Sequence, residues 1–163
     1  NGRHQPPRGA LCADRECEGL MPYQYLDDVA TADIAFEAYG QSKEEMFIAA
    51  SDALMNVMVE DLGTITERLW REVSVEAETL EMLLFQFLQE FIFYKDAEQL
   101  LLRAARMRFK EQKGMWMVTA RAYGEMLDPR KHPLNVDVKA VTMHQFSVSE
   151  SQGQWKARVV LDI

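Results

Sequence analysis

The stretch TADIAFEAYGQSKEEMF, residues 31–47, changes its hydrophobic period near its middle. Up to Gly40 apolar and polar residues alternate, which is typical of a half-buried strand with Asp33 on its polar side. Ser42 and Glu45 then have the spacing of a capping box, in which each side chain satisfies a free backbone N–H at a helix start. The stretch therefore predicts a strand that leads directly into a helix.

The rest of the chain follows the same two periods. Apolar residues at three- and four-residue steps predict helices at 42–58 and 79–95. Apolar or alternating runs between turn residues predict strands at 23–26, 31–40, 69–77, 100–111, 115–123, 135–148 and 155–163. Short connections favour antiparallel neighbours. We therefore predict an α+β fold in two layers, a largely antiparallel sheet with two helices packed on one face.

Length and composition predict one domain. With 163 residues, of which 48% are hydrophobic, the chain is long enough for one ordinary core, which we assign to residues 21–163. Residues 1–20 are polar and lack the apolar stretch of a secretory signal, so we expect a disordered leader or a vector-derived segment outside the fold. Their Cys12 and Cys17 are too few ligands for a zinc site. Without a signal or a run of about 20 apolar residues, we expect a cytoplasmic protein that contacts no membrane.

The charge balance works against nucleic acid as a tightly bound partner. The chain has 26 acidic and 18 basic residues and a formal net charge of −8, whereas tight binding to nucleic acid relies on Lys and Arg at the phosphates. We therefore expect no direct high-affinity binding of RNA or DNA. Basic residues do concentrate in one strand, which we interpret as a solvated face: Arg103, Arg106, Arg108 and Lys110.

Two aspartates occupy strand positions, where Asp is normally depleted. Asp33 lies on the polar side of one strand, and Asp162 alternates with the apolar residues of the last one. Each is interpretable as a solvated outer position. Alternatively, strand pairing brings the two carboxylates together as ligands of one divalent ion, because Ca²⁺, Mg²⁺ and Mn²⁺ prefer oxygen ligands. We treat Asp33 and Asp162 as candidate ligands of such an ion.

The sequence contains few residues or motifs that are typical of a catalytic site. No Gly-rich phosphate loop and no G-x-S-x-G turn occurs. His132, between Lys131 and Pro133, is interpreted as a loop residue, and His144 as a semi-buried one. A metal-dependent hydrolase or nucleotidyl-transfer enzyme using the two aspartates stays open. A general chaperone is a third reading, although most of the ten methionines are expected to fill core gaps.

Four segments together resemble the archease family, whose members are small partner proteins of the RtcB-type RNA-splicing ligase. They are YQYLDDVATADIAFEAYG with the SKEEMF helix start, TLEMLLFQFLQEFIF, KHPLNVDVKAVTMH and the terminal VVLDI. In the family the opening often reads H-T-A-D, whereas Ala30 replaces that histidine here. The resemblance implies that the metal-linked carboxylates are Asp33 and Asp162. It implies that the functional lysine is Lys139, with Lys131 as the alternative.

The resemblance implies a role rather than a reaction. An archease helps the ligase to accept guanylate from GTP and then to turn over repeatedly in tRNA splicing and RNA repair. The expected partner is therefore an RtcB-type ligase, and the chain itself is expected to be a non-catalytic cofactor protein. An acidic protein with two carboxylates and a lysine at one edge is suited to orienting a divalent ion and nucleotide phosphates, because metal ions neutralise charge on a transferring phosphorus centre.

Overall fold

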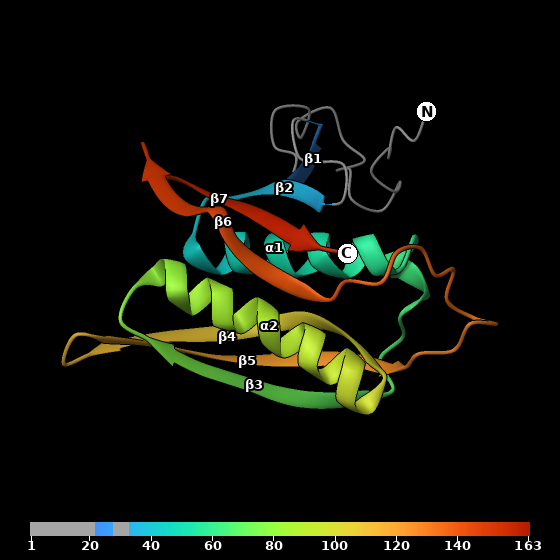
Figure 1. The fold of residues 1–163 in the computed structure, drawn as a ribbon. Helices are drawn as coiled ribbons and strands as arrows, with labels where there is room; N and C mark the ends of the chain where they lie inside the picture. Colours follow the sequence, from blue (N-terminus) through green and yellow to red (C-terminus); the bar gives the residue numbers. More distant parts are fainter. Residues whose placement is uncertain (1–21, 28–32) are drawn as a thin grey trace.

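The structure, a computed structural model, describes residues 22–27 and 33–163 (Figure 1). The predicted leader, residues 1–20 with Cys12 and Cys17, lies outside the described residues. Those described form, in chain order, β1 (Tyr23–Leu26), β2 (Asp33–Gly40), α1 (Lys43–Met58), the 3-10 helix η3 (Leu62–Thr64), β3 (Leu69–Ala77), α2 (Leu80–Glu98), β4 (Leu100–Gln112), β5 (Met115–Met126), β6 (Ala140–Ser151) and β7 (Gln154–Asp162).

The strands of the described residues divide between two antiparallel sheets. The first has the order β1-β2-β7-β6 and the second the order β3-β5-β4. Helix α1 packs on β1, β2 and β7 of the first sheet and on β4 of the second, whereas α2 packs on all strands of the second sheet and on β6. The predicted α+β class, with two helices and antiparallel strands, is confirmed. The structure refines it, because there are two sheets and both helices contact both of them.

The junction between β2 and α1 follows the predicted pattern. Ser42 is the N-cap of α1, and its Oγ accepts a hydrogen bond from the Glu45 N–H at 3.1 Å. The Glu45 carboxylate returns to the N–H of Gln41, one residue before the cap, at 2.7 Å. At Gly40 a Cβ atom would lie 2.5 Å from the Met46 nitrogen, so only glycine allows the helix to start this close to the strand.

A single hydrophobic cluster joins the two helices to the inner faces of both sheets. The Phe47 ring of α1 packs on Phe87 of α2 and on Phe109 of β4, with ring centroids 5.5 and 4.9 Å apart. Leu84 and Phe87, predicted to be core residues, are fully buried. Residues from both helices and both sheets contribute to this cluster. No helix in the described part of the chain is long and apolar enough to cross a membrane.

The largest difference from the predicted elements precedes β6. We expected a strand over 135–148, whereas β6 begins at Ala140 and residues 135–139 form a loop. The pairing of β6 with β7 is also irregular between Thr142 and Ser147. His144 lies in this irregular part and is exposed, so the expectation of a semi-buried histidine was wrong.

Candidate metal and partner site

Asp33 and Asp162 are direct partners in the register between β2 and β7. Directly opposite residues of an antiparallel pair share one face, with Cβ atoms about 4.5–5.5 Å apart. Asp33 is half-buried and Asp162 is exposed, so both stay accessible to solvent. The arrangement therefore meets the two geometric conditions of a shared site, neighbouring strands and a common face. Ion binding itself stays a prediction.

The donor set defines which ions fit this position. In residues 22–27 and 33–163 no group of three or more His, Cys, Asp or Glu side chains is arranged to hold a metal. An ion at Asp33 and Asp162 would therefore have two protein carboxylates and complete its shell with water or phosphate oxygens. Mg²⁺ is commonly held in this way, by one or two carboxylates plus substrate phosphates, whereas Ca²⁺ takes 6–8 oxygen ligands. The two carboxylates fit a divalent ion that prefers oxygen ligands and keeps several waters, such as Mg²⁺, Mn²⁺ or Ca²⁺.

Lys139 lies immediately beside this pair of carboxylates. Its backbone N–H donates a 2.8 Å hydrogen bond to the carbonyl oxygen of Asp162, and the next residue, Ala140, is the β6 partner of Asp162. The Lys139 side chain is exposed and forms no ion pair with another described residue. The structure thus brings Asp33, Asp162 and Lys139 to one end of the first sheet.

The loop that carries Lys139, residues 127–139, is fastened to the C-terminal end of α1. The N–H of Asn135 donates to the Met58 carbonyl at 2.9 Å, and the N–H of Val136 donates to the Val57 carbonyl at 3.2 Å. The last four carbonyls of a helix have no partner within the helix. The loop therefore supplies donors to carbonyls that would otherwise be left unsatisfied.

Lys95 in the last turn of α2 fastens the same loop just before Lys139. Its ammonium donates to the Val138 carbonyl at 2.9 Å and forms ion pairs with Asp137 and with Asp96, the latter at 2.7 Å. The side chain is only 7% exposed. Burial lowers the pKa of Lys95, but the hydrogen bonds and charges of the two aspartates prevail, and the pKa is raised. Lys95 therefore stays charged and holds the loop.

A second cluster fastens the start of the loop to β5. The carboxylate of Glu125 is buried. It forms an ion pair with Lys131 at 2.7 Å, lies 2.6 Å from His132 Nε2, and accepts a hydrogen bond from the Thr66 hydroxyl. His132 Nδ1 accepts from the Asp128 N–H at 2.9 Å, so Nε2 carries the proton and donates to Glu125. Burial raises the Glu125 pKa, but the bonds from Lys131, Thr66 and His132 outweigh it and lower the pKa to about 2.

This cluster changes the interpretation of two sequence candidates. His132 is a loop residue, as expected, but it is buried and structural. Lys131 is the alternative to Lys139. Its ammonium donates hydrogen bonds to Glu125 Oε2 and to Thr66 Oγ1, each at 2.8 Å. An ammonium held in this way is less available for a phosphate or a partner than that of Lys139.

Sequence reasoning missed Lys95 and Glu125. For Lys95 a signal existed, because it follows Phe91 by four residues and thus continues the apolar stripe of α2, where a lysine needs a buried partner. For Glu125 no local signal existed. Its partners Thr66 and Lys131 come from segments that only the fold brings together.

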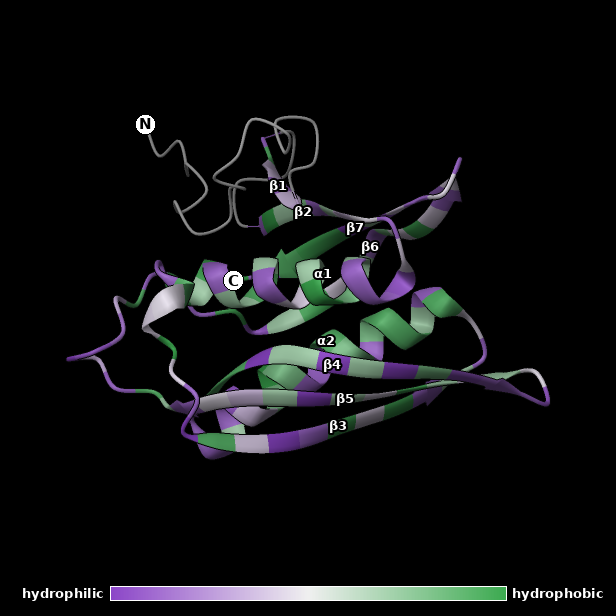
Figure 2. Cartoon of the chain, turned by 180° about the vertical axis from the view of Figure 1, so that it is seen from behind, coloured by the Kyte–Doolittle hydropathy of each residue, from purple (hydrophilic) through white to green (hydrophobic). Residues whose placement is uncertain are grey.

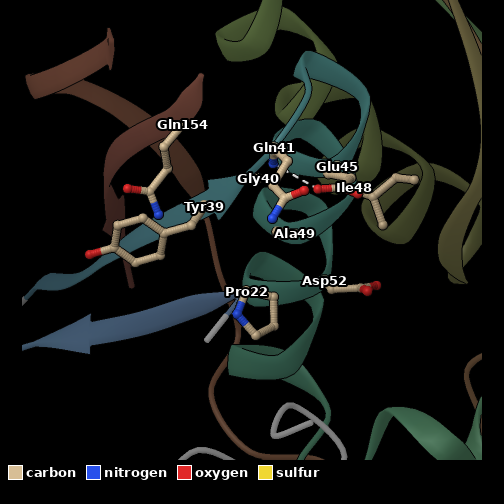
Figure 3. A pocket seen from close by; sticks show the side chains of 9 residues that line it. All are labelled: Pro22, Tyr39, Gly40, Gln41, Glu45, Ile48, Ala49, Asp52 and Gln154. Carbon is tan, nitrogen blue, oxygen red and sulfur yellow. Dashed lines mark hydrogen bonds between the residues drawn. The ribbon is translucent and has the colours of Figure 1, made fainter. Parts of the chain in front are cut away.

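The pocket shown in Figure 3 lies away from the two carboxylates. It has a volume of about 390 Å³ and is lined by Pro22, Tyr39, Gly40, Gln41, Glu45, Ile48, Ala49, Asp52 and Gln154. Gly40 is the last residue of β2 and Gln154 the first of β7, whereas Asp33 and Asp162 stand at the other ends of these strands. The pocket is therefore separate from the candidate metal site.

Comparison with known proteins gives one consistent result. The archease protein family (MTH1598/TM1083) matches residues 23–163. The protein archease of Methanosarcina barkeri is 37% identical over 142 residues, which cover 86% of this chain and 95% of that protein. The protein archease of Pyrococcus abyssi is 40% identical over 134 residues, covering 82% and 94%.

Solved structures agree with the family match. The solution structure of protein 1598 of Methanobacterium thermoautotrophicum superposes with a TM-score of 0.76 at 32% identity, covering 87% of this chain and 99% of that one. The crystal structure of an archease of Thermotoga maritima, described as a possible chaperone, has a TM-score of 0.55 at 23% identity and shows the fold alone. From the family match, the curated relatives and the shared fold together, the chain belongs to the archease family.

Proposed function

We propose that this chain is a non-catalytic accessory protein that activates an RtcB-type RNA ligase. In this role it promotes the GTP-dependent guanylylation of the ligase and its multiple turnover in tRNA splicing and RNA repair. The observation that supports the proposal most is the placement of Asp33, Asp162 and Lys139 at one sheet end. Membership of the archease family supports the partner. We expect the protein to act in the cytoplasm.

Each of the three residues has a chemical task in this proposal. A divalent ion held by the two carboxylates would neutralise negative charge on the nucleotide phosphates. The carboxylates of Asp33 and Asp162 would hold and orient such an ion at an accessible end of the first sheet. The Lys139 ammonium is a mobile point charge suited to a phosphate or to a carboxylate of the ligase. The loop anchored by Lys95 and Glu125 keeps Lys139 beside Asp162.

A ligation assay with the ligase as the limiting component tests the proposal. We expect the ligase, with GTP and divalent ion, to form more than one product per molecule only when this chain is added. The variants Asp33→Ala and Lys139→Ala should remain folded and leave the ligase at a single turnover. Glu78→Gln, which removes an exposed carboxylate between β3 and α2, is the control and should activate fully. Absence of stimulation by the unmodified chain contradicts the proposal.

A stand-alone metal-dependent hydrolase or nucleotidyl-transfer enzyme is the alternative, because two carboxylates on one ion are able to polarise a phosphate. Against it, the sequence contains no Gly-rich phosphate loop and no G-x-S-x-G turn. Incubation of the chain alone with GTP and Mg²⁺ or Mn²⁺ separates the two functions. Turnover of GTP without ligase, lost in Asp162→Ala, favours the enzyme.

A further inference from the structure

The outer face of the second sheet gathers basic side chains through a β-bulge. Simple alternation from Arg103 would place residues 105, 107 and 109 on its face of β4. The register shifts between Ala104 and Arg106, and a bulge inserts one extra residue into a strand. As a result Arg103, Arg106, Arg108 and Lys110 all stand opposite one face of β5, beside Tyr123, Arg121, Thr119 and Met117 respectively.

This face is open in the structure. Helix α2 lies over the other face of the second sheet in Figure 1, and Figure 2 shows the uncovered side with hydrophilic segments along β4 and β5. Arg106, Arg108, Lys110 and Arg121 are exposed. Arg103 differs from them, because its guanidinium is neutralised by Asp52 at 3.1 Å.

The exposed cations are not matched by carboxylates. Arg106, Arg108 and Lys110 form no ion pair with another described residue, and Arg106 stands directly opposite Arg121. Like charges directly opposite each other destabilise a sheet. On β3, Glu72 stands directly opposite Arg121 and Glu76 stands opposite Met117, so the unmatched positive charge is that of Arg106, Arg108 and Lys110 on β4. A bound anion would relieve the repulsion.

Aromatic side chains stand next to the cations on the same face. Trp70 of β3 is paired with Tyr123 of β5, with ring centroids 5.6 Å apart, and Trp70 is 37% exposed. The Arg121 guanidinium lies 4.9 Å from the Trp70 ring centroid. A row of cations beside an exposed aromatic ring is a combination that binds single-stranded nucleic acid. The cations contact the phosphates, and the bases stack on the ring.

We propose that this face binds single-stranded RNA, with its phosphates along Arg106, Arg108 and Lys110 and a base on Trp70. Successive cations on one face of a strand are about 6.7 Å apart, close to the separation of successive phosphates in an extended strand. The aromatic platform favours RNA, whose bases stack on it, over a purely acidic segment such as polyglutamate. Because the net charge of the chain is −8, the binding is weak and salt-dependent rather than of high affinity.

The inference deepens the proposed function, since it assigns a contact to the RNA of the ligation reaction, but its test uses no ligase. Fluorescence anisotropy of a labelled oligoadenylate is measured with the full chain at low salt and over a salt series. Arg108→Glu should weaken binding about tenfold or more and reduce the slope of log affinity against log salt by about 1. Arg130→Glu changes the net charge equally at an exposed loop position and should stay within about twofold.

The aromatic contribution has its own matched pair. Trp70→Ala should weaken oligoadenylate binding about fivefold or more, because stacking of a base on an aromatic ring contributes that much. Phe93→Ala, which truncates an exposed aromatic of α2, should not change the binding of oligoadenylate.

Equal effects of Arg108→Glu and Arg130→Glu on RNA binding overturn the proposal, as does the absence of measurable RNA binding. The proposal is also overturned if polyglutamate displaces the RNA and Trp70→Ala binds the RNA as tightly as the unmodified chain does. That result would assign the face to an acidic protein. Because the ligase is absent, none of these results depends on whether the chain activates it.

Discussion

Asp33 of β2 and Asp162 of β7 stand directly opposite each other across two hydrogen-bonded strands. Like charges in this position destabilise the sheet, so without an ion Asp162→Asn should melt at the same temperature as the unmodified protein or higher. Mg²⁺ or Mn²⁺ should raise the melting temperature of the unmodified protein, because a ligand that binds only the folded state stabilises it, but not that of the variant. Differential scanning fluorimetry with EDTA or metal measures both effects, with Glu76→Gln as a control that keeps the metal response.

The two lysine candidates separate by stability and activity. Lys139 is exposed and unpaired among the described residues, so Lys139→Ala should change the free energy of unfolding by less than about 0.5 kcal/mol and abolish ligase activation. Lys131 is bound to buried Glu125, so Lys131→Ala should destabilise by about 1 kcal/mol, given its partial exposure, and leave activation intact at temperatures where it is folded. Urea unfolding and the ligation assay give the two readouts, and the reverse pattern would assign the functional role to Lys131.

Glu125 gives the stability of the protein a defined acid dependence. Its pKa is lowered from 4.5 to about 2 in the folded protein, so between these values the unfolded chain binds more protons. The stabilisation by ionised Glu125 is therefore complete above pH 4.5 and is lost as the pH falls towards 2. It amounts to roughly 3 kcal/mol.

The matching variant is Glu125→Gln, which has no charge to lose. It should be less stable than the unmodified protein at neutral pH, and its free energy of unfolding should fall less steeply below pH 4.5. Urea unfolding across this range makes the comparison. Parallel pH curves for the two proteins would show that other carboxylates cause the acid sensitivity.

Core residues should behave differently from all of these polar positions. Leu84 and Phe87 of α2 are fully buried, and truncation leaves a cavity in addition to the lost burial. Leu84→Ala and Phe87→Ala should therefore each destabilise the protein by about 2–5 kcal/mol. Thermal melting should show both variants unfolding well before Asp33→Ala or Lys139→Ala. If the polar variants melt as early as the core variants, loss of activation says nothing about a site.

The elements were predictable because their signals are local. Ser42 and Glu45 are three residues apart, and the hydrophobic stripe of α2 lies within the helix itself. The division into two sheets was not predictable in this way, since it depends on pairings between distant segments. The approach of Asp33 to Asp162 is of this kind. The sequence indicated two strand carboxylates, but only the β2–β7 register places them opposite each other.

The segment before β6 was predicted as a strand for an identifiable reason. Val136 and Val138 alternate with polar residues, as in a half-buried strand. Their backbone groups have other partners, however: the Val136 N–H is bonded to α1, and the Val138 carbonyl is bonded to Lys95. Helix ends thus take the hydrogen bonds that a neighbouring strand would otherwise take. The hydrophobic periodicity of a sequence indicates which side chains are buried. It contains no information about which partners the backbone groups bond to.

Lys95 links the end of α2 to the functional loop, and its replacement gives a test of that link. Lys95→Met keeps a long apolar side chain but removes the donor to the Val138 carbonyl and the partner of Asp137. A buried carbonyl left unpaired costs about 1–3 kcal/mol, so the loop should open locally while the core stays folded. The Lys139 N–H, bonded to Asp162, should then exchange with solvent faster.

Two measurements check this link together. Hydrogen exchange followed by NMR should show faster exchange at Lys139 in Lys95→Met, with amides of α1 unchanged, and the ligation assay should show reduced activation. Lys95→Arg, which keeps a charged donor, should recover part of both. Lys156→Met is the control, because it also removes an ammonium and an ion pair, with Glu37 at 3.2 Å, but on β7 and β2 rather than on the loop. Unchanged exchange at Lys139 with full activation would show that the loop is held without Lys95, by its bonds to α1 and to Glu125.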